Sequence, residues 1–307
     1  MSSPRPPSSG VPTADQFTRS PAVPQRTLAT AFARSGPGLH TAGYTNVCVS
    51  PAEADTGIVF RRRLKDGKRV IVPALWHASV PQPLCTALQA ADGSLVRTVE
   101  HLLAALSASG VDNAVVDLDA EELPILDGSA APWCEAIRQA GLTQLTAPRR
   151  SIRVRKRVCV EDGRRSITIT PADHLFIEAR LALAHFGEMS WHGSITPQIF
   201  AEELAPSRSF GRLKWALPLK FYARFSGRSL LRGANLSTTA AIFGNRIIGG
   251  MRVPDEPVRH RILDLIGDLS LAGHPIHGHV SAAHTGHSLN HALVAKLMRD
   301  PTSWELV

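Results

Sequence analysis

The chain of 307 residues is long enough for two domains of ordinary size and a substantial core. Its 44% hydrophobic and 20% charged residues are typical of a globular protein, and no apolar run approaches the roughly 20 residues of a membrane-spanning helix. The net charge of +8 permits an anionic ligand, but the basic residues are scattered, and no long basic run or aromatic platform indicates a nucleic-acid groove.

The cysteines and the N-terminal residues indicate the expected cellular compartment. The four cysteines lie far apart and form no CxxC pair, which argues against a thiolate zinc site and a disulfide scaffold and favours a reducing cytoplasmic setting. Residues 1–24 are rich in serine and proline and lack the apolar segment of a secretory signal, so we expect a disordered tail there. Folded structure is expected to begin near residue 25.

The next part of the chain predicts short strands followed by a buried helix. The strand-like runs are residues 46–49, 57–60 and 69–72. Thr98 can serve as the N-cap of a helix that is apolar at almost every later position through residue 109. Glu100 and His101 lie in its first turn. A buried glutamate is rare unless it is paired, metal-bound or catalytic, and a dipole-stabilised carboxylate beside a structural histidine is the alternative.

Strands dominate the middle of the chain. A strand at 113–118 and a helix at 133–140 come first, and residues 143–148 read as a linker. The alternating pattern then predicts strands at 151–154, 158–160, 166–169, 175–183, 238–243 and 245–248. Between these strands we expect a loop at 184–194, a helix at 196–204, and a stretch at 215–225 that could be helical although Pro218 interrupts it.

The stretch 258–269 organises the remainder of the chain. Read as a helix, it has an apolar face made by Val258, Ile262, Leu265, Ile266 and Leu269. His260, Asp264 and Asp268 fall on a second face, one turn apart. An imidazole and a carboxylate at i and i+4 can point at the same ion, so this face can hold a metal; the alternative is a solvated polar face. A histidine-rich segment and a helix at 288–299 close the chain.

Seven motifs occur in a fixed order between about residue 25 and residue 300. They are Gly38-Leu-His-Thr41, Arg97-Thr-Val-Glu-His-Leu-Leu-Ala-Ala-Leu106, Gly110-Val-Asp-Asn113, Pro124-Ile-Leu-Asp-Gly-Ser-Ala-Ala-Pro132, Asp255-Glu256 with Val258-Arg-His260, Ile262-Leu-Asp-Leu-Ile-Gly-Asp268, and Gly286-His-Ser-Leu-Asn290. The ordered set resembles the zinc-dependent UDP-3-O-acyl-N-acetylglucosamine deacetylase family of lipid A biosynthesis. The resemblance implies an α+β fold of two similar domains, residues 25–145 and 146–307, each layering a small β-sheet against α-helices, with the active site at their interface.

The resemblance also implies the catalytic roles of individual residues. His101, His260 and Asp264 would together hold one Zn(2+) ion, with water as the fourth ligand. Glu100 would be the general base that takes the proton of that water. His287 would act as an imidazolium that stabilises the oxyanion or protonates the leaving amine.

Further roles follow from the same resemblance. Asp268 would hold His287 in the right tautomer and keep its pKa high. Ser209 stands where the family carries a threonine hydroxyl near the oxyanion. The predicted substrate-binding residues are Leu84, Cys85, Phe210, Arg261 and His284. The predicted partner is a small UDP-amino-sugar substrate, and we expect a monomer that binds no nucleic acid.

Several departures from the family pattern leave the substrate open. Arg261 and His284 stand where lysine is usual, and residues 212–215 lack the usual acidic residues. Residues 214–237, the counterpart of the family's acyl-chain passage, are basic and contain Pro218. A related zinc deacetylase acting on another N-acyl amino-sugar nucleotide or nucleoside is therefore an alternative. A non-catalytic nucleic-acid or regulatory binder is a third, disfavoured because the expected metal-binding and acid–base side chains are all present.

Overall fold

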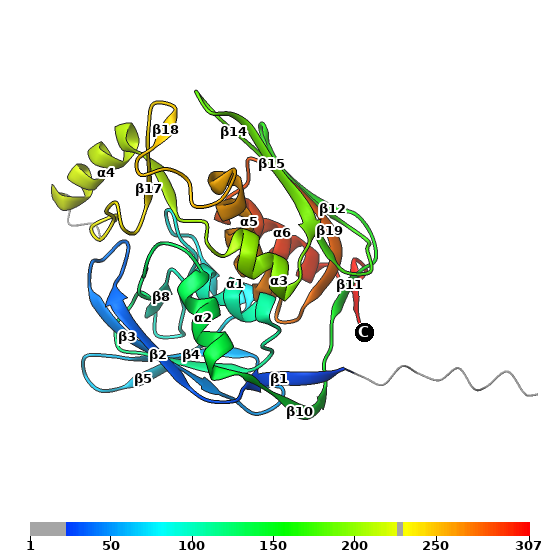
Figure 1. Ribbon diagram of the computed structural model, residues 1–307. Coiled ribbons are helices and arrows are strands. Elements are labelled where there is room, and N and C mark those ends of the chain that lie inside the picture. Colours follow the sequence, from blue (N-terminus) through cyan, green and yellow to red (C-terminus); the bar gives the residue numbers. More distant parts are fainter. Residues whose placement is uncertain (1–22, 226–229) are drawn as a thin grey trace, which may run out of the picture.

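The computed structural model describes residues 23–225 and 230–307, except for some side chains of α4 (Leu213–Phe225). Helices and several small sheets alternate along the chain, which is compatible with the α+β class (Figure 1). The predicted tail lies outside the described residues up to residue 22, and Pro24 already belongs to the first strand. Among the described residues, none of the helices has the length and apolar character needed to cross a bilayer.

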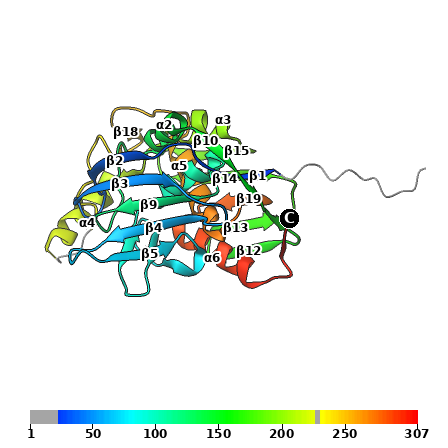
Figure 2. The ribbon, with the colours of Figure 1, turned by 90° about the horizontal axis from the view of Figure 1, so that it is seen from below.

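A five-stranded sheet carries the first half of the chain. Its strands, in spatial order, are β2 (Phe32–Pro37), β3 (Tyr44–Pro51), β9 (Ala114–Leu118), β4 (Ile58–Arg63) and β5 (Arg69–Pro73). All neighbours are antiparallel except β4 and β9, and Figure 2 shows this sheet face-on. Beside it lie η1 (Trp76–Ala78) and a smaller sheet of β6 (Ser79–Val80), β7 (Ala87–Gln89) and β8 (Leu95–Arg97). The four strands predicted here are confirmed.

The linker predicted at 143–148 is wrong, because these residues belong to strand β10 (Leu142–Pro148). This strand pairs antiparallel with β1 (Pro24–Leu28), the first described strand. A local sequence pattern does not predict this strand, because its hydrogen-bonding partner β1 lies far away in the chain. Thr27 of β1 also donates a hydrogen bond to the Asn113 carbonyl, which ties this ribbon to the region before β9.

A seven-stranded sheet carries the second half. Its main path runs β12 (Val158–Asp162), β13 (Arg165–Thr170), β19 (Ile276–Ala283), β11 (Ile152–Val154) and β20 (Trp304–Leu306). The hairpin of β14 (Leu175–Leu183) and β15 (Gly187–Ser194) joins it through β19. The loop predicted at 184–194 is therefore wrong beyond the turn. Met189 and Trp191 are buried at alternate positions, and this period of two is what fixes β15 against the core.

Short helical elements and a third small sheet follow the hairpin. Thr196 caps α3 (Pro197–Ile199) by accepting the Ile199 N–H, and the helix continues as the π-helical turn η2 (Phe200–Leu204). The small sheet contains β16 (Phe210–Arg212), β17 (Ala240–Phe243) and β18 (Arg246–Ile247). The helix α4 is continuous through Pro218, so the interruption expected there does not occur.

Two helices from opposite halves of the chain meet at the centre. They are α1 (Glu100–Ser109) and α5 (Glu256–Leu269), with α2 (Ala131–Ala140), η3 (Ser270–Ala272) and α6 (His287–Arg299) around them. Figure 1 shows α1 and α5 between the five-stranded and seven-stranded sheets. One continuous apolar core contains residues from both halves. The division into two similar domains stays a prediction.

Helix α1 is buried almost all round, as its sequence predicts. The predicted N-cap is wrong. Thr98 has a left-handed backbone (φ 57°), and its hydroxyl donates to the Glu122 carboxylate instead of accepting a helix N–H. Val99 occupies the cap position without a side-chain hydrogen bond. Gly110 ends the helix in the left-handed conformation (φ 78°) that glycine adopts without strain.

Candidate metal centre and catalytic site

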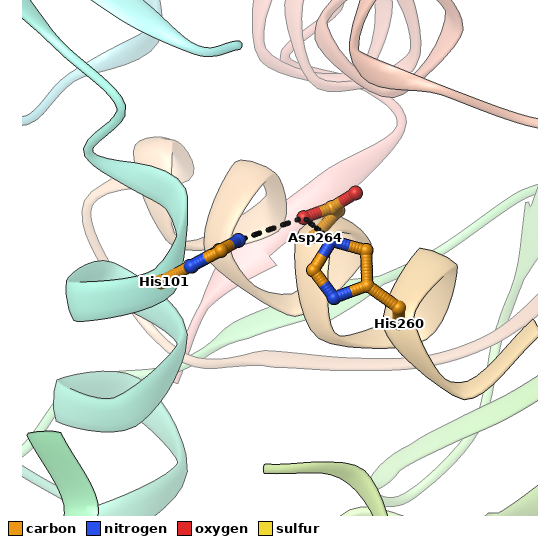
Figure 3. Close-up of side chains that lie close together, drawn as sticks. All are labelled: His101, His260 and Asp264. Carbon is orange, nitrogen blue, oxygen red and sulfur yellow. Dashed lines mark ion pairs between the residues drawn. The ribbon is translucent and has the colours of Figure 1, made fainter. Parts of the chain in front are cut away.

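The three predicted metal ligands converge where α1 meets α5. His101 projects from the first turn of α1, and His260 and Asp264 project one turn apart from α5 (Figure 3). One ligand atom from each lies within 4.8 Å of the other two. Asp264 Oδ1 is 3.6 Å from His101 Nε2 and 3.4 Å from His260 Nε2, and all three side chains are almost completely buried. The polar stripe of the helix at 258–269 is thus no solvated face.

The geometry of the three side chains suits the binding of a divalent metal better than it suits hydrogen bonds between them. Asp264 Oδ1 is buried without a hydrogen-bond partner among the described residues, and its distances to both imidazoles are too long for ordinary N–H···O bonds. His260 Nδ1 lies 3.1 Å from the Ser207 carbonyl oxygen, so it donates there and leaves the Nε2 lone pair facing Asp264. Two imidazole nitrogens and one carboxylate form a usual ligand set for catalytic zinc.

The protonation states of these groups suit the same purpose. Burial lowers the pKa of His260 to about 4, so its imidazole is neutral near pH 7, the form that binds a metal. Burial alone would raise the pKa of Asp264, but the neighbouring His260, His101 and His287 outweigh it and hold that pKa well below its ordinary value. Asp264 is therefore an ionised ligand.

A single glycine permits the close approach of the two helices. Gly267 of α5 lies directly against the backbone of Glu100, where a Cβ would overlap the Glu100 carbonyl oxygen. The small residues Ala104 and Ala105 continue the buried surface of α1. A larger residue at position 267 would push apart the helix that holds His101 and the helix that holds Asp264.

Glu100 is placed to take a proton next to the three ligands. Its side chain is buried, and Oε2 accepts the Thr86 N–H at 3.1 Å. Burial raises its pKa to about 7 despite the opposing effect of His287. Oε1 lies 3.9 Å from His287 Nε2, across the space beside Asp264. A carboxylate that titrates near neutral pH is suited to general base catalysis.

His287 and Asp268 form a tight pair on the other side of that space. His287 Nδ1 donates to Asp268 Oδ2 at 2.9 Å, and Nε2 faces Asp264 and Glu100 at 3.9 Å from each carboxylate. Burial would lower the pKa of His287, but the charge of Asp268 prevails and raises it to about 10. His287 is therefore an imidazolium with one N–H directed at the site. The same imidazole holds the pKa of the fully buried Asp268 below its ordinary value, against the effect of burial.

Asp268 has further partners that sequence reasoning missed. Its Oδ1 accepts the Thr86 hydroxyl at 2.5 Å and His291 Nε2 at 3.1 Å, and its Oδ2 also accepts Asn290 Nδ2 at 2.9 Å. In the sequence, only the spacing of four residues between His287 and His291 indicates that both can face the same partner. Because the ordinary hydrogen bonds already satisfy Asp268, this second His/Asp cluster differs from the first, whose Asp264 Oδ1 has none.

Glu122, for which no role was predicted, is a buried carboxylate that binds Thr98 on the wall of the neighbouring cavity. Glu122 is buried and accepts the backbone N–H groups of His40 and Thr41 and the hydroxyls of Thr41 and Thr98. His40 is completely buried behind Leu39, and burial lowers its pKa to about 4. Glu122 lies within a turn-rich segment, where nothing in the local pattern distinguishes it from a surface carboxylate.

A cavity of about 420 Å³ opens beside these groups. Its wall includes the three metal-ligand candidates, Glu100 and His287, and also the predicted residues Leu84, Ser209, Phe210 and Arg261. The Arg261 guanidinium lies over the Phe210 ring, 5.1 Å from its centroid. The structure does not bring Cys85 or His284 to this wall: the Cys85 side chain is buried, and His284 has a left-handed backbone (φ 52°). Trp215 and Leu219 of α4 close one side.

Comparisons with known proteins agree over most of the chain. A family model described as UDP-3-O-acyl N-acetylglycosamine deacetylase matches residues 25–299. The chain is 40% identical to a UDP-3-O-acyl-N-acetylglucosamine deacetylase of Myxococcus xanthus (strain DK1622), covering 92% of this chain and 89% of the relative. It is 41% identical to the protein of that name from Geobacter sp. (strain M21), covering 92% of each chain, and 38% identical to that of Phenylobacterium zucineum (strain HLK1), covering 92% and 96%.

Proposed function

Because the chain belongs to the UDP-3-O-acyl N-acetylglycosamine deacetylase family, we propose that it is a zinc-dependent hydrolase that removes the N-acetyl group from UDP-3-O-acyl-N-acetylglucosamine in lipid A biosynthesis. The family membership confirms the resemblance inferred from the ordered motifs. The observation that carries the proposal is the convergence of His101, His260 and Asp264 beside an acid–base pair.

His101, His260 and Asp264 would hold the metal. A zinc ion bound by these three residues supplies a Lewis acid that polarises the amide carbonyl and lowers the pKa of water. The chain also keeps these ligands in the protonation states that metal binding requires. His260 is neutral, Asp264 is ionised, and the buried surroundings strengthen every electrostatic interaction in the site.

Two side chains would move the protons of amide hydrolysis. Glu100 takes a proton from the attacking water as oxygen bonds to the acetyl carbon. His287 Nε2 then gives its proton to the departing nitrogen when the carbon–nitrogen bond breaks, which releases acetate and a free amine. Asp268 stays ionised throughout and fixes the direction of His287. Since Glu100 and His287 carry opposite charges before the reaction, each begins in the form that its step requires.

The cavity wall would orient the substrate. The Ser209 hydroxyl, on the cavity wall, would donate to the developing oxyanion, and Leu84 and Phe210 would offer apolar contacts. Arg261, which is one-third exposed, can meet a phosphate group with two parallel hydrogen bonds. A substrate role for Cys85 or His284 receives no support from the cavity.

Acetate release by the purified protein tests this proposal. The zinc-loaded protein should release acetate from UDP-3-O-acyl-N-acetylglucosamine, lose this activity with a chelator, and regain it with added zinc. No turnover by the metal-loaded protein would refute the proposal.

Activity on a matched substrate without the 3-O-acyl chain tests the second candidate function, deacetylation of a different substrate. The altered passage motivates a different amino-sugar nucleotide or nucleoside: residues 212–215 lack the acidic residues that are usual in the family, and the cationic Arg212 lies on the cavity wall. Equal activity on the acylated and non-acylated substrates would favour that candidate. A strong preference for the acylated substrate would favour the lipid A reaction.

A further inference from the structure

The excess positive charge of the chain comes from one segment. Residues 204–254, the basic segment, contain nine arginine and lysine residues and no aspartate or glutamate. The other 256 residues hold 25 of the 34 basic residues and all 26 acidic ones, which nearly cancel. The bases themselves are scattered, as the sequence indicates. The local charge arises because acidic residues are missing between Glu203 and Asp255.

Part of this charge is neutralised by ion pairs. Arg208 pairs with the buried Glu256 at 2.8 Å, and the partly exposed Arg252 pairs with Asp127 at 2.6 Å. Other cations of the basic segment lie at the surface, among them Lys214 on α4 and Arg246 on β18. Lys214 Nζ lies over the ring of Trp215, 5.4 Å from its centroid.

Aromatic side chains lie exposed among these cations. Trp215, Phe221, Tyr222 and Phe225 of α4 are 68%, 66%, 57% and 72% exposed, and Phe243 at the end of β17 is 71% exposed. We call these five residues the aromatic edge. The rings of Phe221 and Phe225, one helical turn apart, contact each other at 4.5 Å between centroids. Apolar side chains that gather on one part of the surface mark a binding site, whereas single exposed apolar residues do not.

The position of α4 leaves this edge open to a large surface. In both views α4 lies at one extremity of the molecule, opposite the C-terminus (Figures 1 and 2). The helix packs against β16 and β17. A helix with basic residues and exposed aromatic rings has the character of an interfacial membrane anchor.

We propose that the aromatic edge and the neighbouring surface cations Lys214 and Arg246 dock the protein on an anionic phospholipid bilayer. The rings would enter the region between headgroups and acyl chains, and the cations would meet the anionic headgroups. A second copy of this chain does not fit the same surface, because two basic faces would repel each other.

Docking has a consequence for the catalytic cavity. Trp215 and Leu219 belong to α4 and also line that cavity. A docked α4 would bring the cavity to the membrane interface, where a molecule bearing an acyl chain concentrates. This consequence rests on the proposed function, whereas the docking itself does not, and it can be measured without any substrate.

Co-sedimentation of the full-length protein with vesicles tests the docking. Mixed phosphatidylglycerol and phosphatidylcholine vesicles should bind the protein, pure phosphatidylcholine vesicles should not, and raising the salt from about 0.1 M to about 0.5 M should weaken binding. Phe221→Ser combined with Phe225→Ser should lower the partition coefficient at least about tenfold. Lys214→Glu combined with Arg246→Glu should also lower it at least about tenfold.

A matched control changes the opposite end of the molecule. Leu306→Ser combined with Arg157→Glu removes an exposed apolar side chain of β20 and reverses a surface cation directly before β12, and should leave binding unchanged. The thermal unfolding midpoint of each variant separates loss of docking from loss of fold. Brominated phosphatidylglycerol should quench tryptophan fluorescence in the unmodified protein, and Trp215→Phe should reduce that quenching.

Three results would overturn the proposal. They are equal binding to phosphatidylcholine vesicles, equal weakening by the control and edge variants, and binding to duplex DNA without binding to either vesicle. A docked protein that lacks deacetylase activity would overturn the proposed function and leave the docking intact.

Discussion

Replacing Asp268 with asparagine should change the pH dependence of catalysis more than its maximum. Asp268 is the strongest of the carboxylates that raise the pKa of His287 to about 10, and Asp264 and Glu100 act in the same direction. Asparagine keeps the shape and can still accept hydrogen bonds, but it carries no charge. Burial then acts on His287 without its main opposing partner, so the pKa of His287 should fall toward the ordinary 6.5.

The expected size of the effect follows from the fraction of imidazolium. A raised pKa keeps His287 protonated below about pH 10 in the unmodified protein. With a pKa of 6.5, about half of the variant would be protonated at pH 6.5 and about one hundredth at pH 8.5. The rate ratio of unmodified protein to variant should therefore rise from about twofold to about a hundredfold across this range, in addition to any constant loss.

Steady-state acetate release at a series of pH values measures this ratio. Titration of the His287 ring nitrogens by NMR in the zinc-loaded protein should show the lowered pKa directly. Asn290→Ala is the matched control, because it removes an uncharged donor to Asp268 at 2.9 Å and leaves the carboxylate in place. A folded Asp268→Asn variant with a pH-independent ratio, or with an unshifted His287 titration, would refute the reasoning.

Further substitutions probe the other parts of the site. Glu100→Gln should lower kcat by about 10²- to 10⁴-fold while the zinc content stays the same; a variant that loses its zinc would make Glu100 a ligand instead of the base. Gly267→Ala should lower the unfolding free energy by about 1–3 kcal/mol, because the new methyl group overlaps the Glu100 carbonyl; an unchanged melting temperature would contradict this packing. Glu256→Ala should destabilise by about 3–5 kcal/mol in urea unfolding, since it leaves the buried Arg208 unpaired, and a loss under 1 kcal/mol would show that Arg208 finds another partner or water.

Local sequence patterns predicted the centre of the fold well. The all-round apolar character of α1 and the apolar stripe of α5 both follow from a period of 3.6 residues, and both helices are present. Glu100 and His101 stand out because charged residues are rare in a buried helix. The i, i+4 spacing of His260 and Asp264 likewise predicts that both side chains lie on one face of the helix.

The errors have a common physical cause, which is that the deciding partner lies far away in the chain. Residues 143–148 become a strand only because β1 is available, and β15 is fixed by β14 and the core. Thr98 fails as a cap because Glu122 captures its hydroxyl. Thr86 acquires its role from Asp268, 182 residues later. No local pattern contains these long-range hydrogen bonds.

Anomalous X-ray diffraction at the zinc absorption edge, on crystals of the zinc-loaded protein, is the most direct test of the metal centre. We expect one strong peak at about 2.0–2.2 Å from His101 Nε2, His260 Nε2 and an Asp264 carboxylate oxygen. A sole peak within the cluster of Asp268, His287 and His291, or no peak near Asp264, would contradict it.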